Sequence, residues 1–582
     1  MTDHIPAAFE AAAIQFEPTL YEKERNIQSL LRLVEQAAQA GARLIVTPEM
    51  GTTGYCWHDR EEAAPMAEPI PGPTTQRFQA LAERHGCHIV VGLPEVDPAS
   101  GLLYNSAALI GPTGVVGTHR KTHSYIAEPK WAAPGDLGHA VFETPLGRIA
   151  LLICMDIHYV ETARLAALAG ADVICHISNW LAERTPAPYW ISRAMENSCY
   201  VIEANRWGLE RTVQFSGGSC IIAPDGRIAA VVDNGDGICQ ATIDPARSRA
   251  RHVLGEPVFT QRRPELYAAL MTNTFLWNPT DFFALYGHRP LPPGKASVIG
   301  AAQFTPGDDV QANLAAIERL ALQARTAHGA ELVVFPELAI SGLNAPQDRA
   351  EPADGASVQR LLRLAMKHGL YLLAGLAERA GDGLYNAAVL LGPAGVVGSS
   401  RKLHLTEADR RWARAGTRWA TFDLPIGRLG VLIGHDATFP EAGRVLALQG
   451  CDVIACPAAT PAGFHGAHGG STVAQNYPIP TGSDPLHWHL YRTRAGENNV
   501  FLAFANGAGT APAGGYSGVF GPDSFLFPRQ EAVVWEAEGL ACLAIDTRSA
   551  EGSRYPTIPV RRKDLVLMRL PHHYKPLVLP SS

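Results

Sequence analysis

The sequence has few cysteines, no long apolar run and no excess of positive charge. Its 582 residues include ten cysteines, which is too sparse for a disulfide scaffold, and no CxxC pair suggests a structural zinc site. No run of about 18 apolar residues occurs, so the sequence predicts no membrane-spanning helix. The net charge of −7 gives no indication of binding to nucleic acid or to an anionic membrane.

The first residues, "MTDHIPAAFEAAAIQFEP", lack a basic segment followed by an apolar core. We therefore expect no signal peptide, and a cytoplasmic protein with reduced thiols. The composition is 47% hydrophobic and 18% charged, which is typical of a globular protein with more than one domain.

The chain repeats itself, in order, over much of its length. Segments of the first half reappear in the second half, and the offset between them changes only in stretches that read as loops. The matching pairs are residues 41–50 with 329–338, 103–117 with 384–398, 170–174 with 450–454, and 193–197 with 494–498. So long a period predicts a duplicated domain rather than a short-period solenoid. We expect a first domain over residues 8–255, a proline-rich extension and linker over 256–296, and a second domain over 297–575.

Within each copy, short runs rich in Ile, Val and Leu alternate with segments of helical spacing. The first copy has strand-like runs at residues 43–49, 88–95, 104–111 and 148–154, and helix-like segments at 26–41 and 74–86. Continuous apolar runs are typical of buried strands, and apolar residues at helical spacing indicate amphipathic helices. This alternation predicts an α/β fold.

Three reactive side chains follow strand-like runs. Glu49 comes after "LIVTP", Lys121 after "GVVGTHR" and Cys154 after "RIALLI". In α/β proteins functional groups collect at strand ends. A carboxylate, an ammonium and a thiol suffice for acyl transfer: the carboxylate takes the thiol proton, the thiolate attacks a carbonyl, and the ammonium stabilises the oxyanion. Singly, each residue more often has an ordinary role, as a small buried thiol, a solvated carboxylate or a surface lysine.

Five ordered segments together resemble the nitrilase, or carbon–nitrogen hydrolase, superfamily. They are "TPEMGTTGY", "HRKTHSYIAEPKWAAPGD", "GRIALLICMDIHYVE", "RAMENSCYVIEANRWG" and "FSGGSCIIAPDG". The resemblance covers residues 8 to about 270, and again 297 to about 570. It implies two tandem α-β-β-α sandwich domains, and a hydrolase that needs no metal or organic cofactor.

The same resemblance implies roles for individual residues. Glu49 would be the general base, Lys121 the oxyanion stabiliser and Cys154 the nucleophile, with the main-chain N–H of Met155 completing the oxyanion hole. Glu128 matches a second family glutamate that orients the site. Two further matches, Asp156 and Asn197, we interpret as a turn carboxylate and a loop hydrogen-bonding residue.

The second copy keeps only part of this set. Glu337 and Lys402 are present, Asp409 stands at the position of Glu128, and Gly434 stands at the position of the nucleophile. Its neighbour His435 matches Met155, and an imidazole one position along points elsewhere. We therefore predict that the second copy forms no thioester.

An insertion of 21 residues also distinguishes the second copy, since the offset between matching segments grows from 280 to 301. Its region contains His465, His468, His487 and His489. Their spacing fits no zinc pattern, and we favour a Gly/Pro-rich loop that covers a surface or pocket.

Members of the family commonly pair as homodimers. We hypothesise that the two copies form such a pair within one chain, as an intramolecular pseudo-dimer, and that the second copy sends a loop or tail toward the first copy's pocket. Further homo-oligomerisation stays open.

The residues after the nucleophile bear on the substrate. Nitrile-cleaving members usually have Trp-Glu there, whereas this chain has Met155-Asp156, which is more similar to amidases and carbamoylases. We expect hydrolysis of the C–N bond of a small amide or N-carbamoyl compound, with release of ammonia or an amine. The alternatives are a nitrilase acting on a nitrile and a non-catalytic binding or assembly protein. Candidate substrate-binding residues are Tyr55, Trp57, His58, Trp131, Asn179 and Trp180, with loop packing as the equally weighted alternative.

Overall fold

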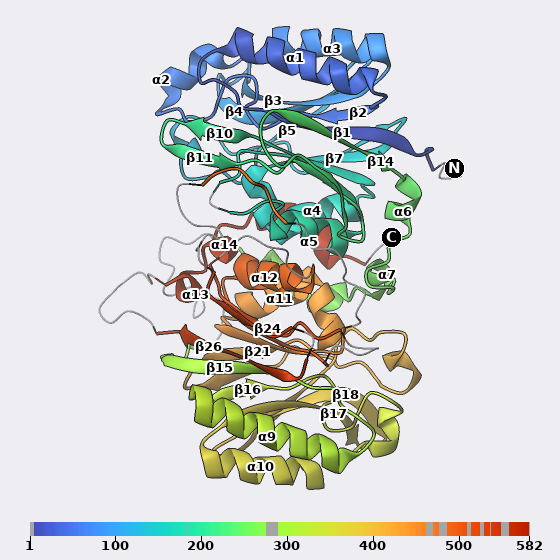
Figure 1. Cartoon of the computed structure of the whole chain (residues 1–582), viewed down its shortest axis with the longest axis vertical. Helices are drawn as coiled ribbons and strands as arrows, with labels where there is room; N and C mark the ends of the chain where they lie inside the picture. Colours follow the sequence, from blue (N-terminus) through green and yellow to red (C-terminus); the bar gives the residue numbers. More distant parts are fainter. Residues whose placement is uncertain are drawn as a thin grey trace. The chain divides into compact units, whose positions relative to one another are not determined.

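The computed structural model describes residues 5–181, 183–274, 289–460, 469–475, 486–508, 514–523, 526, 529–535, 537–548 and 558–580. The chain forms two compact units (Figure 1). Unit 1 comprises Met1–Val253 together with Gly466–Asp484, and unit 2 comprises Leu254–His465 together with Pro485–Ser582. Unit 1 thus includes part of the region that the sequence repeat assigns to the second copy.

The first sheet of unit 1 has six strands in the order β14-β1-β2-β3-β4-β5. Strands β1, β2 and β3 pair in parallel, and the remaining pairs are antiparallel. The strands are β1 (Phe9–Gln15), β2 (Leu44–Val46), β3 (His88–Val96), β4 (Leu103–Gly111), β5 (Gly114–Arg120) and β14 (Gly237–Ile243). Helices α1 (Lys23–Gln39) and α3 (Pro73–His85) cover its outer face (Figure 1).

The second sheet of unit 1 has the order β13-β12-β9-β8-β7-β6. Its strands are β6 (Val141–Thr144), β7 (Gly147–Ile153), β8 (Val173–Ser178), β9 (Tyr200–Asn205), β12 (Cys220–Ile222) and β13 (Ile228–Val231). Helices α4 (Val160–Leu168) and α5 (Pro188–Asn197) lie on this sheet, and β10 (Trp207–Glu210) and β11 (Val213–Ser216) form a separate hairpin. The two sheets face each other, which gives the α-β-β-α layering that the sequence predicts.

The sequence pattern explains how the helices pack. In α1 the buried residues Ile27, Leu30, Val34 and Ala37 recur every three or four positions, so they form one apolar stripe against the first sheet. Helix α3 ends at Gly86, whose φ of 60° is the left-handed conformation that terminates helices. Both helices lie where the helical spacing predicted them.

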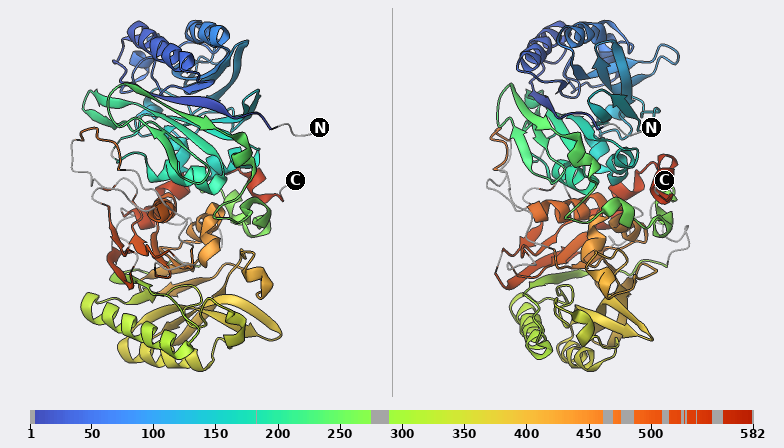
Figure 2. Two further views of the ribbon diagram at one scale, coloured as in Figure 1. Left: turned by 45° about the vertical axis from the view of Figure 1, so that its right-hand side comes forward. Right: turned by 90° about the vertical axis from the view of Figure 1, so that its right-hand side faces the viewer.

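Unit 2 repeats the two six-stranded sheets with their covering helices (Figure 2), and the described residues of unit 2 contain no equivalent of the β10-β11 hairpin. Its sheets have the orders β19-β18-β17-β16-β15-β26 and β20-β21-β22-β23-β24-β25. The strands of the first sheet are β15 (Ala296–Gln303), β16 (Leu332–Val334), β17 (Tyr371–Ala380), β18 (Gly383–Gly392), β19 (Gly395–Arg401) and β26 (Gly539–Asp546). Those of the second are β20 (Thr421–Leu424), β21 (Gly427–Val431), β22 (Val453–Pro457), β23 (Phe501–Ala505), β24 (Gly518–Phe520) and β25 (Glu531–Val533). The main helices are α9 (Val310–His328), α10 (Ala356–His368), α11 (Pro440–Leu448) and α12 (Leu486–Asn498). The matching strand orders support a duplicated domain.

The segment that follows the first repeat belongs to unit 2 as far as residue 274. It contains the short helix α7 (Val258–Gln261), and its side chains bond to the second repeat. Arg262 forms a buried 2.9 Å ion pair with Glu441, and the Tyr267 hydroxyl lies 2.7 Å from His404 Nε2. Within the described ranges, no helix is long and apolar enough to cross a membrane.

Candidate active site

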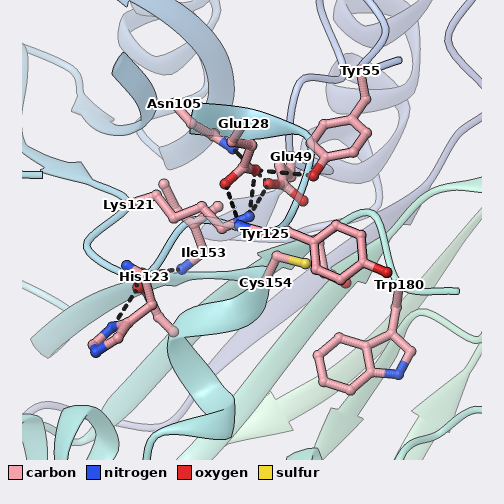
Figure 3. Close-up of polar contacts among 12 residues, drawn as sticks. Glu49, Tyr55, Asn105, Lys121, His123, Tyr125, Glu128, Ile153, Cys154 and Trp180 are labelled. Atoms are coloured by element: carbon pink, nitrogen blue, oxygen red, sulfur yellow. Dashed lines mark hydrogen bonds and ion pairs between the residues drawn. The ribbon is translucent and has the colours of Figure 1, made fainter. Parts of the chain in front are cut away.

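Four of the side chains singled out in the sequence converge at the strand ends of unit 1 (Figure 3). Glu49 follows β2, Lys121 follows β5, and Cys154 follows β7 at the start of a 3-10 turn, Cys154–His158. Glu128 begins another short turn, Glu128–Lys130. The two facing sheets therefore supply the acidic and basic groups from one side and the thiol from the other.

The Lys121 ammonium links the two carboxylates. Its Nζ donates to Glu49 Oε1 at 2.9 Å and to Glu128 Oε1 at 2.6 Å. Asn105 Nδ2 donates to the same two oxygens at 2.6 and 2.9 Å, and the Tyr55 hydroxyl donates to Glu128 Oε1 at 3.1 Å. Oxygen Oε2 of Glu49 is buried and has no hydrogen-bond partner among the described residues. One carboxylate oxygen at this site is therefore available to accept a proton.

Burial and mutual charge perturb the ionisation of this cluster. Burial disfavours the Lys121 ammonium, but the charges of Cys154 in its thiolate form, Glu128 and Glu49 outweigh it, so the pKa of Lys121 is raised well above its usual range. The pKa of Glu128 is also raised, because its burial and the Glu49 charge exceed the effect of Lys121. Lysine thus stays charged, as a group that stabilises an oxyanion must.

Cys154 is held in a strained backbone conformation with a φ of 46°. The residue is 9% exposed, and burial followed by the Glu49 charge raises the pKa of its thiol well above the usual range. Lys121 and the main-chain N–H of Asn179 act in the opposite direction. The resting thiol is therefore protonated, and its proton has to be removed as it reacts. A residue other than glycine with a positive φ at a strand-to-turn junction is typical of functional strain.

Comparison with known proteins identifies the family. The carbon–nitrogen hydrolase family model matches residues 10–252 and again 295–555. This chain belongs to the carbon–nitrogen hydrolase family. It is 35% identical over 262 residues to a protein named nitrilase from Pyrococcus abyssi, a match that covers 44% of this chain and 98% of the relative. It is 30% identical over 278 residues to omega-amidase NIT2 of Xenopus tropicalis, covering 45% of this chain and 98% of the relative.

Among solved structures, the chain is similar to Saccharomyces cerevisiae Nit3, a member of branch 10 of the nitrilase superfamily. The sequence identity is 24%, and the match covers 42% of this chain and 93% of Nit3 with a TM-score of 0.39. The two named relatives each match less than half of the present chain, which is the length of one repeat.

Asp156 fastens the two loops that carry the reactive groups of this hydrolase repeat. Its carboxylate accepts hydrogen bonds from the main-chain N–H groups of Ile153, Thr122 and His123, and lies 2.8 Å from His119 Nε2. The pKa of Asp156 is depressed well below its usual range, because these hydrogen bonds and the two histidines outweigh its burial. It is thus a turn carboxylate, as predicted. Asn197, in contrast, is the last residue of α5 rather than a loop residue, and donates to Arg193 O at 3.0 Å.

The predicted substrate-binding residues other than His58 lie in two places, an apolar cluster and the surroundings of Cys154. Tyr55 and Trp131 are buried in one apolar cluster, with Trp131 packed edge-on against Trp57 at 4.8 Å between ring centroids. Trp180 lies near Cys154 and Tyr125 (Figure 3). Asn179 is 2% exposed, and neither polar atom of its amide has a partner among the described residues.

His58 differs from the other candidates because it is exposed. Its Nε2 lies 2.5 Å from Arg211 Nη1, and its main-chain N–H donates to Glu62 Oε2 at 2.7 Å. The structure therefore places His58 in a surface cluster of charged groups.

Sequence reasoning missed several residues that shape the site. Asn105, which bridges both glutamates, is the chief one, and its signal was the Tyr-Asn pair that the second repeat also contains, at Asn386. His158 stacks on Trp180 with 4.6 Å between ring centroids. His176 Nε2 lies 3.1 Å from the Cys154 carbonyl oxygen, and its other nitrogen bonds to Glu203. These contacts join residues far apart in sequence.

The second hydrolase repeat has the scaffold of the site without a thiol. Lys402 Nζ donates to Glu337 Oε1 at 2.6 Å and lies 2.7 Å from Asp409 Oδ2, and Asn386 donates to both acids. Gly434 has the same φ of 46° as Cys154. A Cβ built on Gly434 would overlap Glu337 Oε2 and lie 3.1 Å from its carboxyl carbon. The carboxylate thus occupies the space that a nucleophile's side chain would need.

The His435 side chain contacts other polar side chains of unit 2. Its Nε2 lies 2.7 Å from Gln261 Oε1 and its Nδ1 lies 2.9 Å from the Thr438 hydroxyl. Burial lowers the pKa of His435 well below its usual range, so it is neutral. Of the histidines in the insertion region, His465, His468 and the His487 side chain lie outside the described residues, and His489 lies in α12. No group of three or more His, Cys, Asp and Glu in the described ranges is arranged to hold a metal ion.

Proposed function

We propose that the first repeat hydrolyses the C–N bond of a small amide or N-carbamoyl compound through a thioester at Cys154. The observation that carries this proposal is the convergence of a buried thiol, an ammonium and a glutamate oxygen that has no partner in the part of the chain that the structure describes. In this scheme Glu49 is the general base, Lys121 and the Met155 N–H stabilise the oxyanion, and Glu128 holds Lys121 in place.

The first half of the reaction forms the thioester. Glu49 Oε2 accepts the thiol proton as Cys154 Sγ bonds to the substrate carbonyl carbon, and negative charge develops on the carbonyl oxygen. The C–N bond then breaks, and the amine leaves with the proton held by Glu49. Since burial keeps the thiol protonated, this proton transfer has to accompany attack, which requires the base within reach.

The second half returns the free enzyme. A water molecule gives a proton to Glu49 and attacks the thioester carbonyl, and the C–S bond breaks to release the acid. The proton on Glu49 returns to the Cys154 sulfur. Lys121 keeps its charge in both halves because two carboxylates surround it.

The surroundings of the thiol favour an amide group as the substrate. The side-chain amide of Asn179, which has no partner among the described residues, adjoins the main-chain N–H that interacts with Cys154, so it is a donor and acceptor for an incoming amide or carbamoyl group. Relatives carry both the names nitrilase and omega-amidase. We favour the amide because Met155-Asp156 follows Cys154 here, whereas nitrile-cleaving members usually have Trp-Glu.

A screen for ammonia release over small amides, carbamoyl amino acids and nitriles tests the proposal. We expect turnover of an amide or carbamoyl compound, loss of turnover in Cys154→Ala, and no loss in the control Cys542→Ala, a partly exposed cysteine in β26 of unit 2. Intact-mass analysis of the acid-quenched reaction should show an acyl adduct on Cys154. Turnover of nitriles alone would refute the amide assignment, and no product from any class would favour the non-catalytic alternative.

A further inference from the structure

A short segment of the second repeat's insertion is part of unit 1. We call Gly469–Gln475 the strap. The Ser471 N–H donates to Thr185 O at 2.6 Å, and the Ser471 hydroxyl shares its single proton between Ser216 O and Asp233 O, each 2.9 Å from the hydroxyl oxygen. The Thr472 N–H donates to Asp233 O at 3.2 Å. These hydrogen bonds thus bind two consecutive strap residues to three separate places in the first repeat.

The strap is also held on both sides of Ser471, by a hydrogen bond on one side and by apolar packing on the other. The Arg184 guanidinium bonds to Gly469 O on one side of Ser471. On the other side Val473 is 9% exposed, and its methyl group lies against Gly217, where a Cβ would come within 3.0 Å of it. The strap is therefore anchored by polar contacts and by burial of an apolar side chain.

The residues bonded to the strap also contact residues that surround the Cys154 thiol. Ser216, whose carbonyl accepts from Ser471, donates its own N–H to Trp180 O at 2.9 Å. Leu181 forms an antiparallel bridge with Phe215, the residue before Ser216. Phe215 packs edge-on against Tyr55 with 6.3 Å between ring centroids, and Tyr55 donates to Glu128.

We propose that the strap is a positioning element, with Ser471 at its centre, that holds Trp180 and β11 in place and so sets the affinity for substrate at Cys154. This rests on the function proposed above. Strap residues touch neither the thiol nor the glutamates in this scheme, so their effect is on binding rather than on bond cleavage. Both ends of the strap continue into unit 2, so a chain cut after the first repeat lacks it. The inactive repeat thereby has a role in the active one.

The sharpest variant is Ser471→Ala, which removes the hydroxyl contacts to Ser216 O and Asp233 O and the hydrogen bond accepted from the Val473 N–H, and retains the main-chain bond to Thr185 O. We expect KM to rise about fivefold for each hydrogen bond lost, with kcat within about twofold of the wild type. Ser471→Thr keeps a hydroxyl and should restore most of the affinity. Thr472→Ala is the matched control, because this exposed residue contributes its main-chain N–H, which alanine retains.

Hydrogen exchange on the full chain tests the positioning without a substrate. Ser471→Ala should increase amide exchange in peptides covering Leu181–Thr185 and β11, and leave peptides from α9 and β16 unchanged. This measurement stands even if no substrate is found, which separates failure of this inference from failure of the proposed function. Unchanged exchange in those peptides would overturn the inference. So would faster exchange with KM and kcat both unaltered, or a fall in kcat alone.

Discussion

Restoring a side chain at Gly434 should not create a second active site. The perturbation is Gly434→Cys in a Cys154→Ala background, so that any thioester chemistry has to come from the second repeat. The backbone there already has the φ of 46° found at Cys154, and Glu337 and Lys402 are in place. Local sequence alone would predict rescue. The structure predicts none, because the Glu337 carboxylate occupies the space of the new side chain.

The expected loss of stability has two parts. A residue other than glycine at this positive φ costs about 1 kcal/mol. Displacing Glu337 weakens its hydrogen bonds from Asn386 and Lys402, each 2.6 Å long, and charge-assisted bonds of this kind contribute about 1–3 kcal/mol. Together these give a destabilisation of unit 2 of about 2–4 kcal/mol.

A double-mutant cycle separates the two parts. Gly434→Ala, Glu337→Ala and the double variant are compared by hydrogen exchange in peptides from β21 and α11, which report the opening free energy of this region. The overlap predicts a coupling of about 1–2 kcal/mol, since removing the carboxylate relieves the collision but not the φ strain. Ammonia release by Cys154→Ala/Gly434→Cys above the level of Cys154→Ala, or wild-type exchange in Gly434→Ala, would refute this reasoning.

Three further outcomes are expected. Asn105→Ala should lower kcat/KM by about tenfold or more, because Asn105 positions both glutamates, and steady-state kinetics within twofold of wild type would contradict this. Burial lowers the pKa of Lys563 from 10.5 to about 8, so between about pH 8 and 10.5 the folded chain binds fewer protons there than the unfolded chain, and the free energy of unfolding should rise with pH. Urea denaturation should show a smaller rise in Lys563→Met, and a rise identical to that of the wild type would disprove this. Burial raises the pKa of all three thiols, to about 12 for Cys56 and about 11 for Cys542, so none is ionised at neutral pH without help. Iodoacetamide should nevertheless label Cys154 faster than the partly exposed Cys56 and Cys542, because Glu49 beside it can take the thiol proton as it reacts; peptide mapping that finds Cys154 no faster would argue against an activated thiol.

The sequence alone determined the duplication, the alternating strands and helices, and the positions of Glu49, Lys121 and Cys154 at strand ends. These features depend on local patterns, because hydrophobic periodicity and turn residues report the burial of each segment. It also determined that the second repeat has glycine where the first has a thiol, since the two segments align without a gap. The family model likewise matches the chain twice, once in each repeat.

Only the tertiary structure decided which polar groups meet. Asn105 and Glu49 are 56 residues apart, and their hydrogen bond exists because β3 pairs with both β2 and β4, which brings Asn105 of β4 to the end of the sheet where Glu49 follows β2. The same is true of the Glu337 carboxylate in the space beside Gly434, and of Ser471, which lies 255 residues from its partner Ser216. Such contacts depend on strand pairing and packing over long sequence separations, which no local pattern encodes.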